Sequence, residues 1–347
     1  MKVAITTYSG GQNYGALLQA HALMTYVNSI GHECQLINNW PFDRRWFKPR
    51  KTKEDIWASL CQIKLGKERI KRYEDFRKNY LNLTHIVKND EELKKLNDEF
   101  DVFITGSDQV WNCTKNVDYG FFLGFTRDEK KKIAYAASFG VSDIPEQFQD
   151  DVKKYLSRMD AISIREKSGA ELVYRLIGLR PCVAVDPVFL MERGYWANMA
   201  VRPNIERFVF VYSTQKSERL NKAVKDFSEK NNIKIVSTHA IPGCKCIVRK
   251  DIAPREFLGY IMDAEYVIST SFHATAFSII FEKNFCVVPH SQTGSRVKDI
   301  CEDANLASCI WNENRFEYNV IDYSNVGIAA IGDRIATSKK FLEESLS

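Results

Sequence analysis

The 347-residue chain exceeds the roughly 250–300 residues at which one hydrophobic core stops growing, so its length predicts two domains. Hydrophobic residues make up 45% and charged residues 27%, which excludes disordered and fibrous classes, and the net charge is only +5. The apolar runs are far shorter than the roughly 20 residues that span a bilayer, and the N-terminus turns polar by Thr6, unlike a signal peptide. We therefore expect a soluble, cytoplasmic protein.

The first half of the chain predicts an α/β domain. Residues 1–8 form a short apolar run typical of a buried strand, 16–32 have helical spacing, and 33–39 read as the next strand. This strand–loop–helix–strand order is a βαβ unit and predicts a parallel sheet. Further strands are expected at 101–110, 131–140, 161–166 and 182–190, with a helix at 145–162.

A basic segment at residues 43–79 interrupts this pattern. It holds 13 Lys and Arg against 6 Asp and Glu, and its aromatic residues include Trp46, Trp57 and Tyr73. Helical spacing in part of the segment favours a solvated pair of helices. The same composition is also typical of peripheral contact with an anionic membrane, here through residues 44–78. Nucleic acid is the least favoured partner, and we expect none.

A second α/β domain is predicted from about residue 205. Strands at 207–213, 233–239, 266–271 and 284–290 alternate with helices at 217–232, 254–264, 273–283 and 295–306. The predicted organisation is a first domain at 1–195, a second at 205–325 and a C-terminal helix at 326–347. Two Rossmann-like domains of this kind would face a cleft, with the ligand at the C-terminal ends of their strands.

The stretch SGGQNYGALLQA places Gly10, Gly11, Asn13 and Gly15 directly before the first helix. Free backbone N–H groups and the helix dipole at such a position favour an anion or a sugar hydroxyl. The spacing differs from the G-x-G-x-x-G pattern, so a dinucleotide is not predicted. A simple tight turn is the alternative.

The stretch TGSDQVWN at 105–112 follows a buried strand and presents Asp108, Gln109, Trp111 and Asn112 at its end. A carboxylate, amides and an indole together suit a sugar, whose hydroxyls need paired acceptors and whose apolar face stacks on an aromatic ring. The alternative is a polar turn capped by Asp108.

The stretch AISIREKSG at 161–169 ends a strand with Arg165. An arginine after an apolar run loses hydration unless an anion or a carboxylate meets it, ideally in a bidentate fork. A substrate anion and an internal salt bridge are both open interpretations.

The stretch ISTSFHATAF at 268–277 has the same strand-to-helix geometry in the second half. Thr270 and Ser271 end the strand, and a helix begins near His273. A helix N-terminus disfavours imidazolium, whereas an anionic ligand beside the ring restores protonation and lets the histidine act as a general acid. A buried core histidine is the alternative.

The nine cysteines are scattered and odd in number, which favours free thiols over a disulfide framework. Cys244 and Cys246 form a C-x-C pair near His239, but a structural zinc site needs four ligands and no second pair is near. We expect no metal.

Taken in order, the motifs resemble the polysaccharide pyruvyl transferase family. The resemblance spans roughly residues 3–310 and includes QNYGA, GSDQVWN, YAASFG, ISIREKSG, VDPVFL and an S-x-x-H turn followed by SR-x-x-DI. It implies a GT-B-like fold and an enzyme that moves enolpyruvate from phosphoenolpyruvate onto sugar hydroxyls of a surface polysaccharide or its lipid-linked precursor, usually as a cyclic ketal. It implies no cofactor besides this co-substrate.

The resemblance also implies roles for individual residues. Arg165 matches the arginine that grips the donor phosphate or carboxylate, and His273 matches the histidine proposed to protonate the donor. From its placement in the first, acceptor-side domain, Asp108 is expected to orient or deprotonate the acceptor hydroxyl. The expected substrate-binding residues are Asn13, Tyr14, Gly15, Ser107, Gln109, Trp111, Asn112, Ser138, Thr270, Ser271, Ser295 and Arg296.

One position differs from the family pattern. Members carry an arginine two residues before this histidine, where Ser271 stands here. A serine gives one neutral hydrogen bond in place of a charged fork. Either Arg296, Lys167 or another cation compensates, or the donor is not phosphoenolpyruvate. The alternative functions are a GT-B glycosyltransferase with a nucleotide-sugar donor and a non-catalytic glycan-binding relative.

Overall fold

The computed structural model describes residues 1–38, 67–215, 217–289, 294–312 and 320–347. Most of the basic segment, up to residue 66, lies outside the described residues. The chain divides into two compact units. Unit 1 comprises Met1–Lys64, Glu74–Leu190 and Arg334–Ser347, and unit 2 comprises Leu65–Tyr73 and Met191–Asp333.

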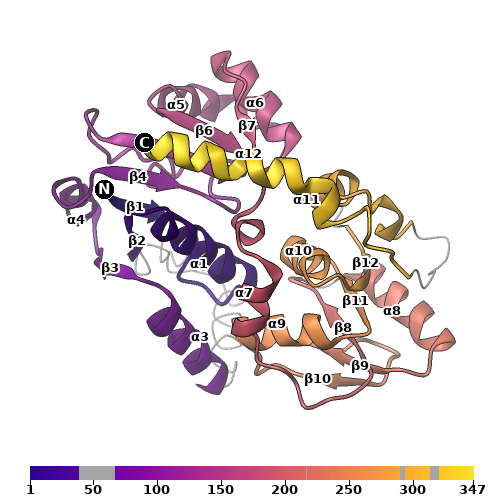
Figure 1. The fold of residues 1–347 in the computed structure, drawn as a ribbon. Helices are drawn as coiled ribbons and strands as arrows, with labels where there is room; N and C mark the ends of the chain where they lie inside the picture. The colour runs from indigo at the N-terminus through magenta and orange to yellow at the C-terminus, as the bar shows by residue number, and fades with distance from the viewer. Residues whose placement is uncertain (39–66, 216, 290–293, 313–319) are drawn as a thin grey trace, which may run out of the picture. The chain divides into compact units, whose positions relative to one another are not determined.

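Unit 1 is built on a seven-stranded parallel sheet with the order β3-β2-β1-β4-β5-β6-β7 (Figure 1). Its strands are β1 (Lys2–Thr6), β2 (Glu33–Asn38), β3 (Leu83–Ile86), β4 (Val102–Thr105), β5 (Lys131–Ala137), β6 (Ala161–Ile164) and β7 (Cys182–Val183). All four residues of β4 are buried, as expected for a parallel strand covered on both faces.

The helices of unit 1 lie on both faces of this sheet. Strand order runs one way from β1 to β3 and the other way from β4 to β7, so right-handed crossovers place the helix after β1 and the helices after β5 and β6 on opposite faces. These elements are α1 (Tyr14–Ser29), α4 (Asp90–Lys95), η2 (Leu96–Asp98), α5 (Glu146–Leu156), α6 (Lys167–Ile177) and η3 (Pro187–Leu190).

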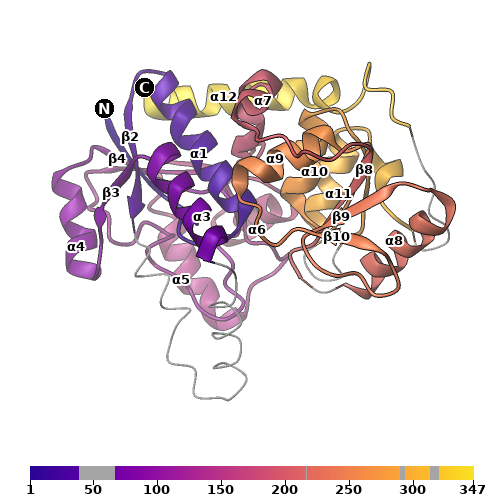
Figure 2. The ribbon, with the colours of Figure 1, turned by 90° about the horizontal axis from the view of Figure 1, so that it is seen from below.

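Unit 2 repeats the design with a five-stranded parallel sheet of order β10-β9-β8-β11-β12, and Figure 2 shows β8, β9 and β10 side by side. Its strands are β8 (Phe208–Tyr212), β9 (Lys234–Ser237), β10 (Cys246–Val248), β11 (Tyr266–Ser269) and β12 (Asn284–Val287). Its helices are α7 (Arg193–Met199), α8 (Glu218–Lys230), α9 (Pro254–Asp263), α10 (Phe272–Ile280), α11 (Ser295–Asp303) and η4 (Ala307–Cys309). The predicted α/β class with two Rossmann-like halves is confirmed.

Among the described residues, two helices contribute to both units. Helix α3 (Lys67–Tyr80) begins in unit 2, where Arg72 lies 3.6 Å from Asp251 and 3.4 Å from Glu256. Helix α12 (Ile328–Leu346) begins in unit 2 and continues in unit 1 from Arg334. The sequence predicted a separate C-terminal helix at 326–347, whereas most of α12 belongs to unit 1.

The unit 1 part of α12 is held by polar contacts as well as packing. The Arg334 guanidinium donates to the backbone carbonyls of Arg165 at 2.8 Å and Ala184 at 3.0 Å. The Val185 N–H donates to Ser338 Oγ at 2.9 Å. These bonds fix the backbone of the loops that follow β6 and β7.

Both sheets reverse their strand order once, between β1 and β4 in unit 1 and between β8 and β11 in unit 2. In open α/β sheets the C-terminal edge at such a reversal is the usual ligand site. No helix in the described part of the chain combines the length and apolar character needed to cross a membrane.

Candidate active site

The loops after β4 and β5 place Asp108 and Ser138 beside each other in unit 1. Asp108 adopts a left-handed backbone conformation with φ of 70° and forms a parallel bridge with Ala137. The Ser138 N–H donates to the Asp108 carbonyl at 3.1 Å. The sequence predicted Asp108 at this edge and Ser138 as a substrate-binding residue, and the structure brings the two together.

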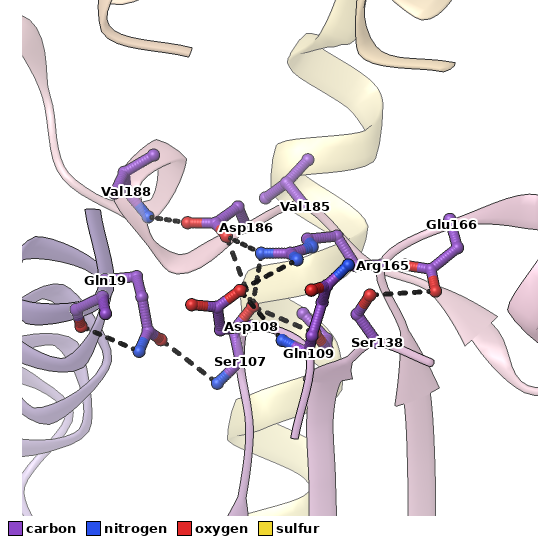
Figure 3. Close-up of polar contacts among 12 residues, drawn as sticks. Gln19, Ser107, Asp108, Gln109, Ser138, Arg165, Glu166, Val185, Asp186 and Val188 are labelled. Carbon is purple, nitrogen blue, oxygen red and sulfur yellow. Dashed lines mark hydrogen bonds and ion pairs between the residues drawn. The ribbon is translucent and has the colours of Figure 1, made fainter. Parts of the chain in front are cut away.

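Arg165 follows β6 and lies between two carboxylates (Figure 3). One guanidinium nitrogen donates to Asp186 Oδ2 at 2.6 Å, and the other lies 3.5 Å from Asp108 Oδ1. The side chain is 2% exposed in Arg165, 0% in Asp186 and 15% in Asp108. Burial acts to lower the pKa of Arg165, but the neighbouring carboxylates raise it above its ordinary value, so the guanidinium stays charged.

Asp186 is a member of this cluster that the sequence analysis did not single out. Its Oδ2 also accepts from Ser107 Oγ at 3.3 Å, and its Oδ1 accepts from the Val188 N–H at 3.2 Å. One sequence signal could have identified Asp186: it stands between a short predicted strand and a proline, in the VDP of VDPVFL.

Glu166 is a second such residue, and it is 1% exposed. Its Oε1 accepts from Ser138 Oγ at 3.0 Å, the Phe139 N–H at 3.0 Å and the Gly140 N–H at 3.3 Å. The amide end of Gln109 occupies the space that a Cβ at Gly140 would need. The Glu166 carboxylate therefore fixes the turn after β5, against which Gln109 packs.

The glycine loop supports the same edge from β1. Asn13 caps α1 by accepting from the Ala16 N–H at 3.3 Å, and Tyr14 and Gly15 are buried in the first turn. From that helix, Gln19 accepts from the Ser107 N–H at 3.2 Å and donates to Thr7 Oγ1 at 2.9 Å (Figure 3). The ends of β1 and β4 are thus joined at the strand-order reversal, by a glutamine that the sequence analysis missed.

The side chains of Trp111 and Asn112 have partners outside this cluster, although the Trp111 backbone N–H donates to the Ser138 carbonyl at 3.1 Å. The Trp111 indole is fully buried, stacks on Phe122 with a centroid separation of 5.1 Å, and donates to the Phe121 carbonyl at 3.0 Å. Asn112 accepts from the Thr114 hydroxyl at 2.7 Å within a local turn. The indole therefore packs in the core and does not offer a face to a sugar ring.

In unit 2, hydroxyl groups gather where β8 and β11 end. Ser213 Oγ and Thr270 Oγ1 lie 2.9 Å apart and join the two strand ends. Ser271 begins α10 as its N-cap, accepting from the Ala274 N–H at 3.4 Å, and its own N–H donates to Ser269 Oγ at 2.9 Å. The second strand-order reversal is therefore lined with hydroxyls.

His273 lies in the first turn of α10, directly beyond these hydroxyls. It is 6% exposed and meets Phe272 edge to face, with ring centroids 5.3 Å apart. Ser295 and Arg296 open α11, which packs against α10. Thr270, Ser271, His273 and Arg296 all belong to unit 2, whereas Asp108 and Arg165 belong to unit 1.

No three His, Cys, Asp or Glu side chains in the described ranges lie close enough together to hold a metal ion. Cys244 and Cys246 carry free thiols. Burial lowers the pKa of His239, which favours its neutral form.

Solved structures share the fold at low identity. Staphylococcus aureus MnaA with UDP is 10% identical, with a TM-score of 0.55 and coverage of 99% of this chain and 90% of that one. The UDP-GlcNAc 2-epimerase of Neisseria meningitidis bound to UDP-GlcNAc is 7% identical, with a TM-score of 0.51 and coverage of 100% and 99%. An alpha-glucosyltransferase in complex with UDP and DNA is 9% identical, with a TM-score of 0.51 and coverage of 100% and 95%. The chain has the GT-B-like fold of these proteins.

No curated protein sequence matches the chain significantly. A family model described as polysaccharide pyruvyl transferase matches residues 13–292. That range contains Asp108, Arg165 and His273, whereas Ser295 and Arg296 lie just beyond it. The chain belongs to the polysaccharide pyruvyl transferase family.

Proposed function

We propose that this protein transfers a pyruvyl group from phosphoenolpyruvate to two hydroxyls of one sugar, in a surface polysaccharide or its lipid-linked precursor. The observation that carries the proposal is the family match over residues 13–292. Further support comes from the polar clusters at the strand-order reversals of both units, where α/β sheets hold their ligands.

The reaction requires an acid and a base. An acid adds a proton to the methylene carbon of phosphoenolpyruvate, and a sugar hydroxyl attacks the adjacent carbon as a base takes the hydroxyl proton. Phosphate then leaves with its bonding electron pair, and the second hydroxyl of the sugar closes the ketal as its proton is lost. The products are a pyruvyl ketal and inorganic phosphate, so atoms and charge balance.

His273 is the proposed acid. Its place in the first turn of α10 combines an imidazole with a helix N-terminus, which attracts anions. A donor phosphate or carboxylate bound there would favour the protonated ring and let it deliver the proton. In this proposal Arg296, Thr270 and Ser271 complete the donor contacts, with Arg296 supplying the positive charge that an arginine at position 271 would give.

Asp108 is the proposed base for the acceptor. Three carboxylates, those of Asp108, Asp186 and Glu166, surround the single guanidinium of Arg165, and each acts to raise its pKa. This excess of negative charge suits a neutral sugar better than an anionic donor. The contacts therefore support a role for Arg165 in holding Asp108 and Asp186, in place of the donor grip that the resemblance implies.

The test is phosphate release from phosphoenolpyruvate in the presence of a panel of methyl glycosides, with ketal formation followed by mass spectrometry. His273→Gln should lower turnover by about 10²–10⁴-fold because the proton donor is lost. Asp108→Asn should lower transfer similarly, yet leave the thermal stabilisation by phosphoenolpyruvate in place. His85→Gln, at an exposed position on β3, is the control and should behave as wild type.

Two results would contradict the proposal. Undiminished phosphate release in His273→Gln would remove the assigned acid. Stabilisation by nucleotide sugars, together with nucleotide release and no response to phosphoenolpyruvate, would instead identify a glycosyltransferase on the same fold.

A lipid-linked acceptor would bring the protein to a membrane, and we propose that the basic segment 43–79 makes that contact. The proposal draws on sequence composition, since residues 43–66 lie outside the described residues. Within the described part of the segment, the Arg72 guanidinium is already paired with Glu68, Asp251 and Glu256. We assign the contact to residues 44–53 because this stretch holds six basic side chains and no acidic one.

A further inference from the structure

In unit 1 the guanidinium of Arg165 lies at different distances from two carboxylates. Arg165 lies 2.6 Å from Asp186 Oδ2 but 3.5 Å from Asp108 Oδ1. Asp186 is fully enclosed, whereas Asp108 retains 15% of its side-chain exposure. The inner acid therefore takes the close contact and the outer acid, which solvent can reach, takes the longer one.

The carboxylate of Asp186 accepts hydrogen bonds from three groups. Besides Arg165, the carboxylate of Asp186 accepts from Ser107 Oγ at 3.3 Å and from the Val188 N–H at 3.2 Å. Arg334 holds the Arg165 carbonyl at 2.8 Å, so the guanidinium extends from a fixed backbone. The Arg165 nitrogen that contacts Asp186 also donates to Ser107 Oγ at 3.4 Å, so movement of either side chain breaks more than one hydrogen bond.

The outer acid is fixed by its backbone. Asp108 has a φ of 70°, and its Oδ1 accepts from the Gln109 N–H at 2.9 Å. Its position at the sheet edge is thus set independently of Arg165, and the distance to the guanidinium depends on where Asp186 holds that group.

We propose that Asp186 is a positioning residue: by holding Arg165 it keeps the guanidinium from closing onto Asp108, and so leaves the Asp108 carboxylate basic enough to accept a proton from a sugar hydroxyl. This role rests on the proposed function, in which Asp108 takes that proton as the oxygen bonds to the donor carbon. Asp186 touches neither substrate in this proposal and acts only through Arg165.

The charges that face Asp108 determine the direction of each expected change. They include the guanidinium of Arg165 and, around that guanidinium, the carboxylates of Asp186 and Glu166. Asp186→Asn removes a like charge and releases Arg165 toward Asp108, and both effects lower the pKa of Asp108. Arg165→Gln removes the opposite charge and leaves the carboxylates facing one another, which raises it.

Carboxyl carbon NMR of the full chain, labelled with ¹³C at aspartate, measures this directly. The Asp108 signal is assigned by its disappearance in Asp108→Asn. We expect its titration midpoint to move to lower pH in Asp186→Asn and to higher pH in Arg165→Gln. Asp98→Asn, which breaks the exposed pair with Arg127 at 2.8 Å, is the matched control and should leave the midpoint unchanged.

A midpoint that stays in place or rises in Asp186→Asn would overturn the proposal. If Asp186→Asn does not fold, the double variant Asp186→Asn/Arg165→Gln replaces the buried ion pair by two amides, which a buried site tolerates better than a lone charge. There the Asp108 midpoint should rise, because the nearer of the two lost charges is the positive one. An unchanged midpoint in this variant would count against the arrangement.

The transfer assay separates this proposal from the proposed function. If wild type forms a ketal, the acidic limb of its kcat/KM profile should follow the NMR midpoint to lower pH in Asp186→Asn, with KM for phosphoenolpyruvate unchanged. An acidic limb that does not follow the midpoint would overturn the positioning role. Absence of any transfer by wild type would defeat the proposed function, while the NMR shifts would still decide the electrostatic relation among Asp186, Arg165 and Asp108.

Discussion

Ser271 accepts from the Ala274 N–H at 3.4 Å and so caps the helix that carries His273. A serine before a helix satisfies a backbone donor that would otherwise have no partner within the helix. From the sequence, Ser271 was predicted to bind substrate and was compared with the arginine of the family pattern, but its role as a helix cap was not predicted. Its local bond gives the serine a structural reason to stand here, whatever holds the donor.

Replacement of Ser271 by alanine should reduce the free energy of unfolding by about 1 kcal/mol, the usual cost of losing an N-cap. Ser271→Asp is the matched control, because its carboxylate can cap the helix, and it should stay close to wild type. Urea denaturation followed by circular dichroism measures both. Equal stability of wild type and Ser271→Ala would show that the cap contributes nothing.

Residue types at strand ends could be predicted from the sequence, but their partners could not. Asp108 and Arg165 were expected at one sheet edge because parallel strands end together, and the structure places them 3.5 Å apart. Asp186 escaped notice because its pairing with Arg165 depends on the register of β6 against β7, which composition does not reveal. Tryptophan is a residue type that stacks on sugar rings, but the Trp111 indole packs in the core against Phe122 and Phe139.

At the scale of elements, helix α9 depends on a glycine to lie close to its neighbouring chain. A Cβ at Gly259 would collide with the Val201 carbonyl, and the Val201 N–H donates to the Arg255 carbonyl at 3.0 Å. Gly332 in α12 is also helical, but nothing surrounds its Cβ position within 4 Å. Gly259 is therefore required by close packing, whereas at Gly332 a side chain would meet no steric obstacle.

Gly259→Ala and Gly332→Ala should therefore change stability in opposite directions. We expect Gly259→Ala to lower the free energy of unfolding by about 1–3 kcal/mol, because the added methyl group overpacks the contact with Val201. Gly332→Ala should raise it by about 0.5–1 kcal/mol, because alanine restricts the unfolded chain. Thermal unfolding of each variant tests the pair, and stabilisation by both would show that α9 has room to shift.

At the scale of the whole molecule, the net charge of +5 conceals a local surplus. Residues 43–79 carry 13 basic against 6 acidic side chains, so the remainder of the chain is slightly acidic. Each basic residue near an anionic bilayer contributes about 1 kcal/mol of attraction, which salt screens. If the proposed membrane contact exists, its binding free energy should depend on the number of basic residues in segment 43–79.

Replacing the six basic residues of the 44–53 cluster by glutamine should abolish co-sedimentation with phosphatidylserine vesicles. The residues are Arg44, Arg45, Lys48, Arg50, Lys51 and Lys53. The control removes the same number of charges from exposed lysines elsewhere, at Lys94, Lys95, Lys153, Lys154, Lys225 and Lys230. Equal binding of both variants, or wild-type binding that survives high salt, would contradict the contact.

Fold class was the most predictable property of this chain. Alternating apolar strands and helices require a parallel sheet in each half, and both sheets have that arrangement. Short elements were harder to predict. The three-residue strand β10 was not predicted, and of the strand predicted at 182–190 only the two residues of β7 are strand, because Pro187–Leu190 form a 3-10 helix. The placement of α12 also depends on long-range bonds, such as that from Arg334 to the Arg165 carbonyl, rather than on its own amphipathic sequence.

The division of α12 between the units has a consequence for biosynthesis. Unit 1 contains residues from Met1 onward, but it also needs Arg334–Ser347, which follow the whole of residues 191–333. Chains emerge from the ribosome N-terminus first, at about 5–20 residues per second. The loop carrying Arg165 must therefore wait, without Arg334 on its carbonyl, until translation has passed through unit 2. During that interval the backbone carbonyls of Arg165 and Ala184 lack the hydrogen bonds that Arg334 donates to them, although the carboxylates that pair with the Arg165 guanidinium are already synthesised.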